Sequence, residues 1–574
     1  MSTKANFRWD EVRANNPIFS ATRTTIETAF YGNNVVKVNS LKEAYKLAKN
    51  SRGTIVTDMP VEKPEEIGLD DDAKILVSNS GAVFGRTAAA RRIAGEEGVD
   101  VNDLCMKIRD AIYDTKDRKM YHTQAYIGLD KDFIIKAHLI IPEGEENLMY
   151  NWLLNFQYIN GEYTKMYKES KVFDNEGDIY IFVDPSWQHK EHPLGLAFFD
   201  PKHNCAAILG MKYFGELKKG TLTLAWGIAN RNGYASCHGG QKRYNLPDGR
   251  KFVAGVFGLS GSGKSTITHA KHKDKYDVTV LHDDAFIIST ENGSSIALEP
   301  SYFDKTQDYP LDSPDNKYLL AVQNVGVTLD DEGRKVIVTE DIRNGNGRAI
   351  KSRLWSPNRV DKFDEPVNAI FWLMKDPTMP PVLKINGAVL SATMGACLAT
   401  KRTTAERLAK GIDPDALVFE PYANPFRTYP LSDDYAKFKA LFEERNVDCY
   451  ILNTGFLMNK KVTPDVTLSC LEAIIEGKGE FKQWAGFSSF EIMEVDGFVP
   501  DMSDGEYKSQ LMSRMRDRLD FIKSLDKAKG GFDKLPKEAI DAMEKVIGEL
   551  WLYFKSVSNL IHFFYWQNST KKVY

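Results

Sequence analysis

The chain has 574 residues, a length that exceeds what one hydrophobic core usually supports and that indicates about two large domains. Its hydrophobic fraction of 43%, charged fraction of 27% and formal net charge of −4 exclude a general electrostatic attraction to nucleic acid or to anionic membranes. Six cysteines without a Cys-x-x-Cys pair do not make a disulfide scaffold. No signal-like N-terminus or membrane-length apolar run is present, so we expect a cytoplasmic protein that binds no nucleic acid and no membrane.

Two adjacent lysines, Lys218 and Lys219, come directly after an apolar run in the segment Tyr213–Gly220, and His238 follows nineteen residues after Lys219. Paired lysines are most often part of a solvated turn, and a single histidine is most often a structural residue. These residues alone therefore do not identify a site, and their meaning depends on the motifs that follow.

The segment Gly258–Thr266 reads Gly-Leu-Ser-Gly-Ser-Gly-Lys-Ser-Thr and predicts a phosphate-binding loop. The apolar run Phe252–Phe257 before it suits a buried strand, and the residues after Lys264 can begin a helix. Glycines let backbone N–H groups approach phosphate oxygens, while Lys264 can reach the outer phosphates and Ser265 can hold Mg²⁺. A chance Gly/Ser-rich turn is the competing interpretation, and the strand and helix around the loop disfavour it.

Two neighbouring carboxylates, Asp283 and Asp284, follow the β-type run Val278–Leu281. They are therefore expected at the C-terminal end of a strand, which is where the metal ion of a bound nucleotide needs acidic ligands. Further along, a Gly-rich patch from Asn344 to Arg348 predicts a loop that brings Arg348 within reach of a ligand.

The region from Asp504 onward has a helical composition, with apolar residues spaced at Leu511, Met515, Leu519 and Ile522. Near the chain end, Ile561–Trp566 forms a dense aromatic group. Two interpretations remain open for this group, a helix docked on the core of its own chain and a contact that forms a homo-oligomer.

The order of these motifs resembles that of the ATP-dependent phosphoenolpyruvate carboxykinases. The resemblance rests on Tyr-x-Gly-Glu-x-Lys-Lys-Gly from Tyr213, the later histidine, the phosphate loop and the Asp-Asp pair. It extends in patches from about Ser80 to Ile475, is strongest from Ala206 to Asp284, and includes Pro380-Pro-Val382, Cys449-Tyr-Ile-Leu-Asn453-Thr-Gly455, and Lys460-Lys461 followed by Thr467. Several motifs in one order are far more specific than any one of them.

The resemblance implies a mixed α/β (α+β) fold of two domains, with the active site in the cleft between them. Residues 1–233 would form the substrate-side domain, and residues 234–574 the nucleotide domain with its phosphate loop and a helical extension from about residue 504. The implied activity is the reversible conversion of oxaloacetate and ATP to phosphoenolpyruvate, ADP and CO₂. Such small molecules are the expected partners.

The resemblance also implies roles for individual residues. Lys219, His238 and Asp284 resemble ligands of a transition metal such as Mn²⁺, and Ser265 and Asp283 resemble supports of the Mg²⁺ that ATP carries. The implied catalytic residues are Arg86, Lys218, Lys219, Lys264 and Arg348, and the implied substrate contacts are Arg86, Tyr213, Lys219 and Arg348. The implied nucleotide contacts are Ser260, Gly261, Ser262, Gly263, Lys264, Ser265, Thr266, Asp283, Lys461 and Thr467.

Chemistry favours these residue types. Decarboxylation of oxaloacetate leaves an enolate, so the site must hold negative charge on oxygen, which a metal ion and cations do. A lysine can bind a metal only as the neutral amine, and a neighbouring ammonium such as Lys218 favours that form. Because oxaloacetate has two carboxylates, planar arginines suit its capture better than lysines, and Arg86 and Arg348 are the candidates.

The sequence departs from the family at several places. Arg86 is followed by Thr-Ala-Ala-Ala-Arg91-Arg92 instead of Ser-Pro-Lys-Asp-Lys, so a basic helical face begun near Thr87 is an alternative interpretation of these arginines. Ala285–Ile288 replaces the Glu-His-Gly-Trp that normally follows the acid pair, and Leu457-Met-Asn459 replaces an Asn-Gly-Thr-Gly turn near the adenine. The GTP-dependent branch carries a cysteine where Ser262 lies here, so ATP is favoured.

Two other functions remain as alternatives. The chain could be a P-loop kinase for another small molecule or for a protein, with the same loop and acid pair but without decarboxylation. It could also be a catalytically silent nucleotide-binding relative. Tyr213, Lys219 and His238 disfavour the first, since simple phosphoryl transfer needs no second metal site, and the intact Lys264 and Asp284 disfavour the second.

Overall fold

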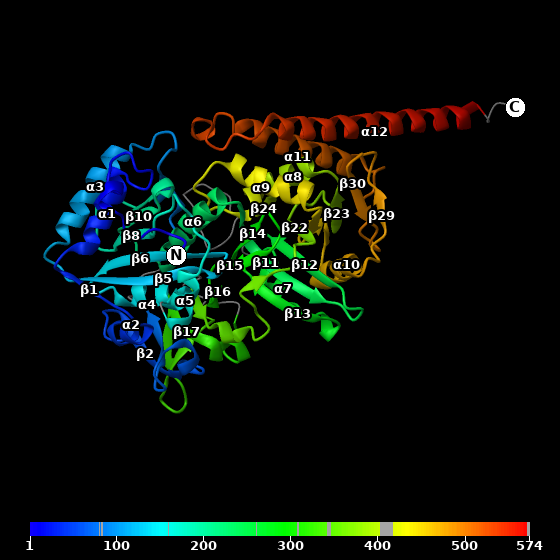
Figure 1. The fold of residues 1–574 in the computed structure, drawn as a ribbon. Coiled ribbons are helices and arrows are strands. Elements are labelled where there is room, and N and C mark those ends of the chain that lie inside the picture. Colours follow the sequence, from blue (N-terminus) through cyan, green and yellow to red (C-terminus); the bar gives the residue numbers. More distant parts are fainter. Residues whose placement is uncertain are drawn as a thin grey trace.

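The computed structural model describes the backbone of residues 1–570 except positions 80, 82–83, 159, 260, 307–308, 341–345 and 402–416, and side chains as far as residue 556 except at residue 401. Within these residues the chain is a mixed α/β protein built around two large sheets (Figure 1). The predicted fold class is therefore confirmed. The first sheet, in blue and cyan, belongs to the N-terminal half, and the second, mainly green to orange, belongs to the C-terminal half.

The first sheet has helices on both faces. In the order β1-β5-β6-β8-β10-β9-β4, with β7 at the side of β5, its strands are Val35–Lys37, Met120–Asp130, Phe133–Pro142, Ile179–Asp184, Cys205–Leu209, Leu196–Asp200, Arg91–Ile93 and Gln157–Tyr158. Alternate residues of β8 point to opposite faces, as strand geometry requires. Tyr180 and Phe182 join one hydrophobic cluster, and Ile179 and Ile181 join another.

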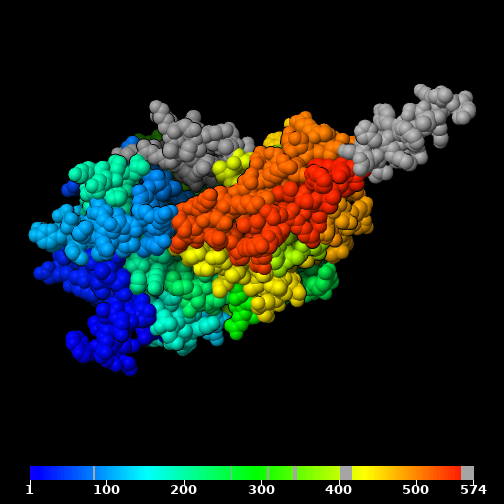
Figure 2. All heavy atoms as spheres, turned by 90° about the horizontal axis from the view of Figure 1, so that it is seen from above, coloured from blue at the N-terminus to red at the C-terminus, as the bar shows by residue number. Residues whose placement is uncertain are grey.

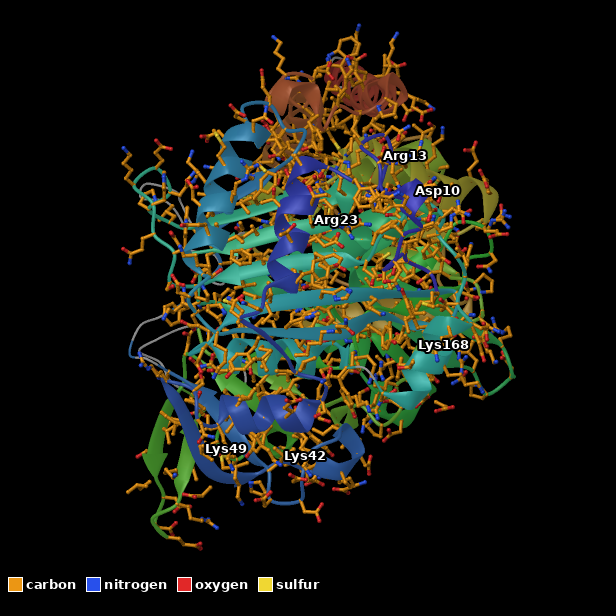
Figure 3. All side chains as sticks on the ribbon, turned by 60° about the vertical axis from the view of Figure 1, so that its left-hand side comes forward. Asp10, Arg13, Arg23, Lys42, Lys49 and Lys168 are labelled. Atoms are coloured by element: carbon orange, nitrogen blue, oxygen red, sulfur yellow. The ribbon has the colours of Figure 1, made fainter. Side chains whose placement is uncertain are left out.

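One face of this sheet is covered by α1 (Ala21–Thr28) and α3 (Val101–Asp114), and the other by α4 (Glu146–Asn155) and α6 (Phe214–Arg231). Figure 3 shows α1 lying across the strands with Arg23 directed along the sheet. Arg23 is only 1% exposed, donates to the His203 carbonyl at 2.7 Å, and lies over the ring of Tyr180. The buried guanidinium thus ties α1 to the sheet through hydrogen bonds and a ring contact.

The second sheet carries the predicted phosphate loop. In the order β21-β15-β14-β11-β12-β22-β26-β23-β30-β29, with β13 beside β11, its strands are Lys362–Phe363, Ser295–Ala297, Ala285–Ser289, Tyr234–Asn245, Lys251–Phe257, Ala369–Met374, Asp448–Asn453, Val382–Ile385, Phe490–Met493, Phe481–Gln483 and Asp277–His282. β12 leads through the loop into α7 (Lys264–His269). Gly263 precedes this helix with φ of 94°, a conformation that side-chain-bearing residues rarely adopt. The strand predicted before the loop and the helix predicted after it are confirmed, and the phosphate-binding role of the loop stays a prediction.

A smaller sheet links distant parts of the chain. Its order is β16-β20-β17-β3-β2, with strands Tyr302–Lys305, Arg348–Lys351, Leu319–Gln323, Lys74–Ser78 and Thr54–Pro60. Residues 302–351 therefore pair with residues 54–78, across the predicted domain boundary at residue 233. Helices α2 (Leu41–Ala48) and α5 (Gly161–Lys168) lie on the N-terminal side of the molecule (Figure 1). The two-domain division itself stays a prediction.

The remaining helices cover the second sheet. They are α8 (Ala388–Ala396), α9 (Leu431–Glu444), α10 (Pro464–Glu476), α11 (Gly505–Ser524) and α12 (Lys537–Thr570). Three two-stranded sheets are also present in the described part of the chain: β18 and β19 (Gly326–Leu329, Lys335–Val338), β24 and β25 (Ala399–Lys401, Leu417–Phe419), and β27 and β28 (Phe456–Leu457, Lys460–Lys461).

The C-terminal helices dock on the rest of the chain. Leu511, Met515 and Ile522 of α11 are buried in the same cluster as Met543 and Leu550 of α12, which confirms the predicted helix after Asp504. Seen from above in Figure 2, these orange and red segments lie across the yellow region that contains α9. The aromatic side chains of Ile561–Trp566 lie outside those described. No helix in the described part of the chain combines the length and the apolar character needed to cross a membrane.

The buried carboxyl of Asp434 on α9 makes the stability of the fold depend on pH. Its Oδ1 accepts a hydrogen bond from the Tyr429 hydroxyl at 2.8 Å, while its Oδ2 is buried without a partner. Burial raises the pKa of Asp434 to about 7, although Arg427 acts in the opposite direction. The folded protein therefore holds a proton that the unfolded chain releases near pH 4.

We expect Asp434→Asn to be more stable than the parent at pH 8 and about equally stable at pH 4. Between these values the parent loses stability as the pH rises, by about 4 kcal/mol, whereas the amide cannot ionise. Urea denaturation midpoints at both pH values would measure this effect. Glu444→Gln, on an exposed residue of the same helix, is the control, and equal pH dependence in parent and Asp434→Asn would contradict the prediction.

Candidate active site

A cavity of about 300 Å³ brings most of the predicted site residues together. Its walls come from the phosphate loop, from the start and first turns of α6, from the ends of β13 and β16, and from the loop before α9. The lining residues that had been predicted are Arg86, Tyr213, Lys219, His238, Gly261, Gly263, Lys264, Ser265, Thr266, Asp283, Asp284 and Arg348.

The carboxylate of Asp284 lies at the centre of a group of nitrogen atoms. Lys219 Nζ is 2.8 Å from its Oδ2 and 2.9 Å from its Oδ1. Lys218 Nζ lies 2.7 Å from Oδ2, and His238 Nε2 lies 3.1 Å from Oδ1. Lys264 Nζ of the phosphate loop completes the group at 3.4 Å from Oδ1. Two parts of the sequence pattern, the lysine pair and the phosphate loop, thus meet at one acid.

The local structure explains how these side chains converge. Helix α6 is buried along almost its whole length between the two large sheets, and its first turns carry both lysines. His238 lies on β11, whose backbone pairs with β14 directly after the acid pair, so that His238 and Ala285 are register partners. His238 Nδ1 donates to the Ala423 carbonyl. This bond leaves Nε2 without a proton and directed at the cavity, as a metal ligand requires.

The charges of the two lysines differ because their surroundings differ. Burial opposes the charge of Lys218, but the carboxylates of Asp284 and Glu299 outweigh burial and raise its pKa. Burial lowers the pKa of Lys219 to about 8, and Lys218 and Lys264 add repulsion that Asp284 offsets only in part. Lys219 is therefore the lysine that can become a neutral amine near physiological pH.

The acids and the histidine are in the states that metal binding needs. Burial lowers the pKa of His238 to about 3, with Lys264 and Lys219 adding to the effect, so the imidazole is neutral. Burial opposes the ionisation of Asp284, but Lys218, Lys219 and Lys264 outweigh it and hold its pKa well below the usual range. The arrangement offers the neutral imidazole of His238, the carboxylate of Asp284 and, once it loses its proton, the amine of Lys219, a donor set that accepts a divalent transition metal.

The second acid, Asp283, faces the phosphate loop. Its Oδ2 is 3.4 Å from Nε2 of His269, and this contact contributes to holding the pKa of Asp283 below its usual range against the effect of burial. Ser265, the second residue of α7, carries a hydroxyl and lines the same cavity. Ser262 is buried but does not line the cavity, and Ser260 lies outside the described residues.

Arg348 and Tyr213 form one wall of the cavity. Arg348 is 4% exposed, and its Nε donates to the Tyr213 hydroxyl at 3.2 Å. Its Nη2 is buried without a hydrogen-bond partner. This unpaired N–H donor at the cavity wall could donate a hydrogen bond to an anionic ligand.

Arg86 also lines the cavity, and its neighbour Arg91 does not. Arg86 Nη2 donates to the Pro425 carbonyl at 3.1 Å, and its guanidinium lies 4.4 Å from the ring centre of Phe426. Arg91 instead lies close to Glu216, with 3.5 Å between the charged atoms. The alternative of a basic helical face is wrong, because Ala88–Ala90 forms a single 3-10 turn and Arg91–Ile93 forms β4.

Two of the predicted nucleotide contacts lie away from the cavity lining. Lys461 is exposed on β28, and Thr467 is buried in α10, where its hydroxyl donates to the Thr463 carbonyl at 3.4 Å. Lys461 belongs to the hairpin around Leu457-Met-Asn459, which departs from the family pattern, and Thr467 lies in the helix that follows this hairpin. Their roles stay predictions.

Some residues of the site were missed in the sequence. Glu299 is fully buried and holds Lys218 at 3.0 Å, and a lone acid in an apolar run after the acid pair was the signal that could have revealed it. The ring of Phe426 lies 4.8 Å from Lys219 Nζ and also faces Arg86. No local pattern marks this phenylalanine. Asp304, Lys305 and Phe303 of β16 also line the cavity.

The departure after the acid pair has a structural explanation. Ala285, Phe286, Ile287 and Ile288 form most of β14 and are fully buried. They pair with Cys237 and its neighbours on β11 and fill the core on both faces of the sheet. This segment therefore supports the backbone that presents His238 and Asp284, instead of adding side chains to the cavity.

Comparison with known proteins gives one consistent result. A family model described as phosphoenolpyruvate carboxykinase matches residues 66–502. An ATP-dependent phosphoenolpyruvate carboxykinase of Aeropyrum pernix is 27% identical over 343 residues, which cover 56% of this chain and 68% of the relative. Enzymes of the same name from Bradyrhizobium sp. strain BTAi1 and Staphylococcus aureus strain Newman are 22% and 24% identical, with 67% of this chain covered in each case and 71% and 72% of the relatives.

The matched region contains every predicted site residue, from Arg86 to Thr467, and ends just before α11. The comparisons do not favour a different P-loop kinase or a silent relative. On this match, the chain belongs to the ATP-dependent phosphoenolpyruvate carboxykinase family, a family of enzymes that use ATP and a divalent metal ion.

Proposed function

We propose that the chain decarboxylates oxaloacetate and transfers a phosphoryl group from ATP to give phosphoenolpyruvate, ADP and CO₂, in a reversible reaction. The observation that carries this proposal is the meeting of Lys219, His238 and Lys264 at the single carboxylate of Asp284. A simple kinase needs the phosphate loop and its acid, but it has no use for a neutral amine and a neutral imidazole beside them.

Two metal positions are part of the proposal. Lys219 Nζ, His238 Nε2 and Asp284 would hold Mn²⁺, because their mixed nitrogen and oxygen donors converge. The pKa values favour neutral His238 and ionised Asp284, and the lowered pKa of Lys219 makes its amine easier to deprotonate. Ser265 and Asp283, which both line the cavity, would hold the Mg²⁺ of ATP through oxygen ligands. When bound, these ions supply positive charge beside the oxygens where negative charge develops.

The arginines at the cavity wall would orient the substrate. The free Nη2 of Arg348 and the guanidinium of Arg86 offer donors for the two carboxylates of oxaloacetate. The Tyr213 hydroxyl, already bonded to Arg348, fixes the plane of that guanidinium. Decarboxylation then leaves an enolate oxygen near Lys218 and Lys219, where positive charge lowers the energy of the anion.

Lys264 would act on the nucleotide. Its contact with Asp284 is the longest of the lysine contacts, so its ammonium can turn toward a phosphate with little loss. The backbone of Gly261 and Gly263 lines the same end of the cavity and leaves room for phosphate oxygens close to the chain. The enolate oxygen would then attack the outer phosphorus while Lys264 neutralises charge on the group in transfer.

The test is the formation of phosphoenolpyruvate and CO₂ from oxaloacetate with ATP, GTP, pyrophosphate or no phosphoryl donor, each with Mg²⁺ alone and with added Mn²⁺. We expect turnover with ATP that increases when Mn²⁺ is added. Absence of turnover under every condition, from folded protein that binds ATP, would overturn the proposal. Equal turnover with GTP would instead contradict only the nucleotide preference.

A further inference from the structure

A second cavity, of about 690 Å³, lies beside the loop of residues 185–195 that joins β8 to β9. It shares no lining residue with the active-site cavity. Its wall includes His189 and His192, and Gly210 and Lys212 on its other side lead directly into Tyr213 and α6. The proposed reaction uses none of the side chains of this loop.

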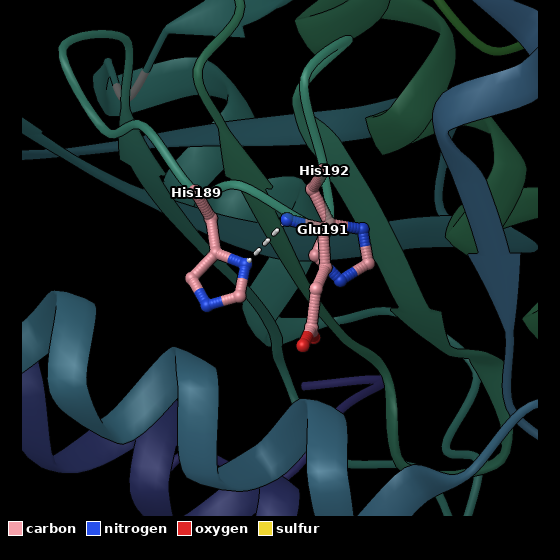
Figure 4. A group of neighbouring side chains, drawn as sticks. All are labelled: His189, Glu191 and His192. Atoms are coloured by element: carbon pink, nitrogen blue, oxygen red, sulfur yellow. Dashed lines mark hydrogen bonds between the residues drawn. The ribbon is translucent and has the colours of Figure 1, made fainter.

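Three potential metal ligands of this loop cluster together. His189, Glu191 and His192 each offer one ligand atom, and these atoms all lie within 4.8 Å of one another. Figure 4 shows the two imidazoles and the carboxylate grouped on the loop, with a dashed line from the Glu191 backbone N–H to Nδ1 of His189. Donor atoms around a tetrahedral zinc ion are about 3.3 Å apart, so small side-chain rotations would complete the geometry.

The surroundings hold the imidazoles in place. The ring of Trp187 is stacked on that of His189, with 5.6 Å between centroids and 6° between planes. The backbone of the loop closes on itself, because the N–H of His192 donates to the His189 carbonyl at 3.0 Å. Nδ1 of His189 accepts the Glu191 N–H at 3.2 Å, which orients the ring, and a metal ion bound at Nδ1 would replace this hydrogen bond.

The carboxylate of Glu191 has a cationic partner that it can release. Lys107 Nζ lies 3.1 Å from Glu191 Oε2, and Asp103 shares the same ammonium. Lys107 can therefore remain paired with Asp103 when the carboxylate of Glu191 turns to a cation.

We propose that His189, Glu191 and His192 form a binding site for a transition-metal ion of the zinc class, separate from the active site. Two imidazoles and one carboxylate are a frequent donor set for Zn²⁺, and the adjoining cavity leaves the remaining coordination position open to water or to a small anion. Mg²⁺ and Ca²⁺ are poor occupants, because they prefer a shell of oxygen ligands. Bound metal would fix the loop against the segment that leads to Tyr213.

The site is tested by equilibrium dialysis of the full chain against micromolar Zn²⁺ with excess Mg²⁺ present. We expect the parent to bind one zinc ion more than the variant His189→Ala/His192→Ala, and Glu191→Gln to bind that ion at least about tenfold more weakly. Lys190→Ala, an exposed residue of the same loop, is the matched control and should bind zinc as the parent does.

A second arm separates this site from the active site. Zinc can also occupy the donors around Asp284, so His238→Ala should lose that equivalent and keep the loop equivalent. Equal zinc content in the parent and in the double histidine variant would overturn the proposal. Zinc-dependent dimerisation in sedimentation, abolished by the same histidine changes, would also overturn it, because the ion would then be shared between two copies.

Discussion

Asp284→Asn is expected to lower the turnover of oxaloacetate by about a thousandfold or more. The amide keeps the shape of the side chain but removes the negative charge that Lys218, Lys219, Lys264 and the imidazole of His238 all face. Three ammonium groups then repel one another in a buried space, and the proposed metal site loses its anionic ligand.

This change is expected to affect metal binding as well as turnover. The apparent affinity for Mn²⁺, measured by electron paramagnetic resonance of the free ion, should fall with the turnover. Removing one partner of a buried charge group also destabilises a fold by about 3 to 5 kcal/mol, so circular dichroism must show that the variant is folded at the assay temperature. The remaining bond between Lys218 and Glu299 limits this loss.

Asp277→Asn is the matched control. Asp277 begins the same strand, β13, but its carboxylate is exposed and contacts only Asn245 among the partners found in the described residues. It should keep the turnover and the Mn²⁺ affinity of the parent. An Asp284→Asn variant that is folded and retains the Mn²⁺ response of the parent would contradict the role of Asp284 as a ligand.

The parts of the site that the sequence predicted are those with local causes. The phosphate loop needs glycines at fixed spacing between a strand and a helix, and β12 and α7 flank Gly263 as expected. The Asp-Asp pair could also be placed from the local sequence, because the apolar residues of β13 predict a strand that ends just before the pair. Lys218 and Lys219 could be predicted as site residues only from their order among the other motifs, because an adjacent lysine pair is also typical of a solvated turn.

The parts that could not be predicted depend on contacts between distant segments. Its apolar surroundings could mark Glu299 as unusual, but nothing near Glu299 or Phe426 in the chain indicates that these residues meet Lys218 and Lys219. These contacts arise from the packing of α6 between two sheets. The different positions of Arg86 and Arg91 also depend on contacts between distant segments. Burial beside Glu216 decides the position of Arg91, and no periodicity reveals it.

The pairing of β17 with β3 could not be predicted from the local sequence either. Strands around residues 76 and 321 are 245 residues apart and join in one sheet, although each reads only as a short apolar run. This sheet also contains β20, which begins at Arg348. A long-range pairing of this kind thus determines where a substrate-side arginine lies, while the local sequence determines only that Arg348 follows a glycine-rich loop.

Lys264→Ala is expected to lower phosphoryl transfer by about a thousandfold or more while the fold is retained. The side chain has two interactions that could explain such a loss, its proposed contact with the outer phosphates of ATP and its observed contact with Asp284. The second contact is long, with 3.4 Å between Lys264 Nζ and Asp284 Oδ1. Asp284 also keeps its two closer lysines, Lys218 and Lys219, after the change. Loss of the phosphate contact should therefore dominate.

The two explanations differ in what else they change. If Lys264 acts on the phosphates, the variant binds ATP more weakly or turns it over more slowly, while its activation constant for Mn²⁺ stays within about twofold of the parent, a difference of less than 0.5 kcal/mol. If Lys264 mainly balances Asp284, the Mn²⁺ constant shifts and ATP binding does not. Lys264→Arg should not restore activity, because the planar guanidinium does not fit the place of a compact ammonium.

Lys271→Ala provides the control for both measurements. Lys271 is the second residue after α7, is exposed, and carries the same charge without lining the cavity. Its removal should leave turnover, ATP binding and the Mn²⁺ constant as in the parent. Because the loop backbone and Ser265 remain in Lys264→Ala, residual ATP binding in that variant would measure what the backbone N–H groups contribute without the lysine. Unaltered turnover in Lys264→Ala would remove the phosphate-loop assignment altogether.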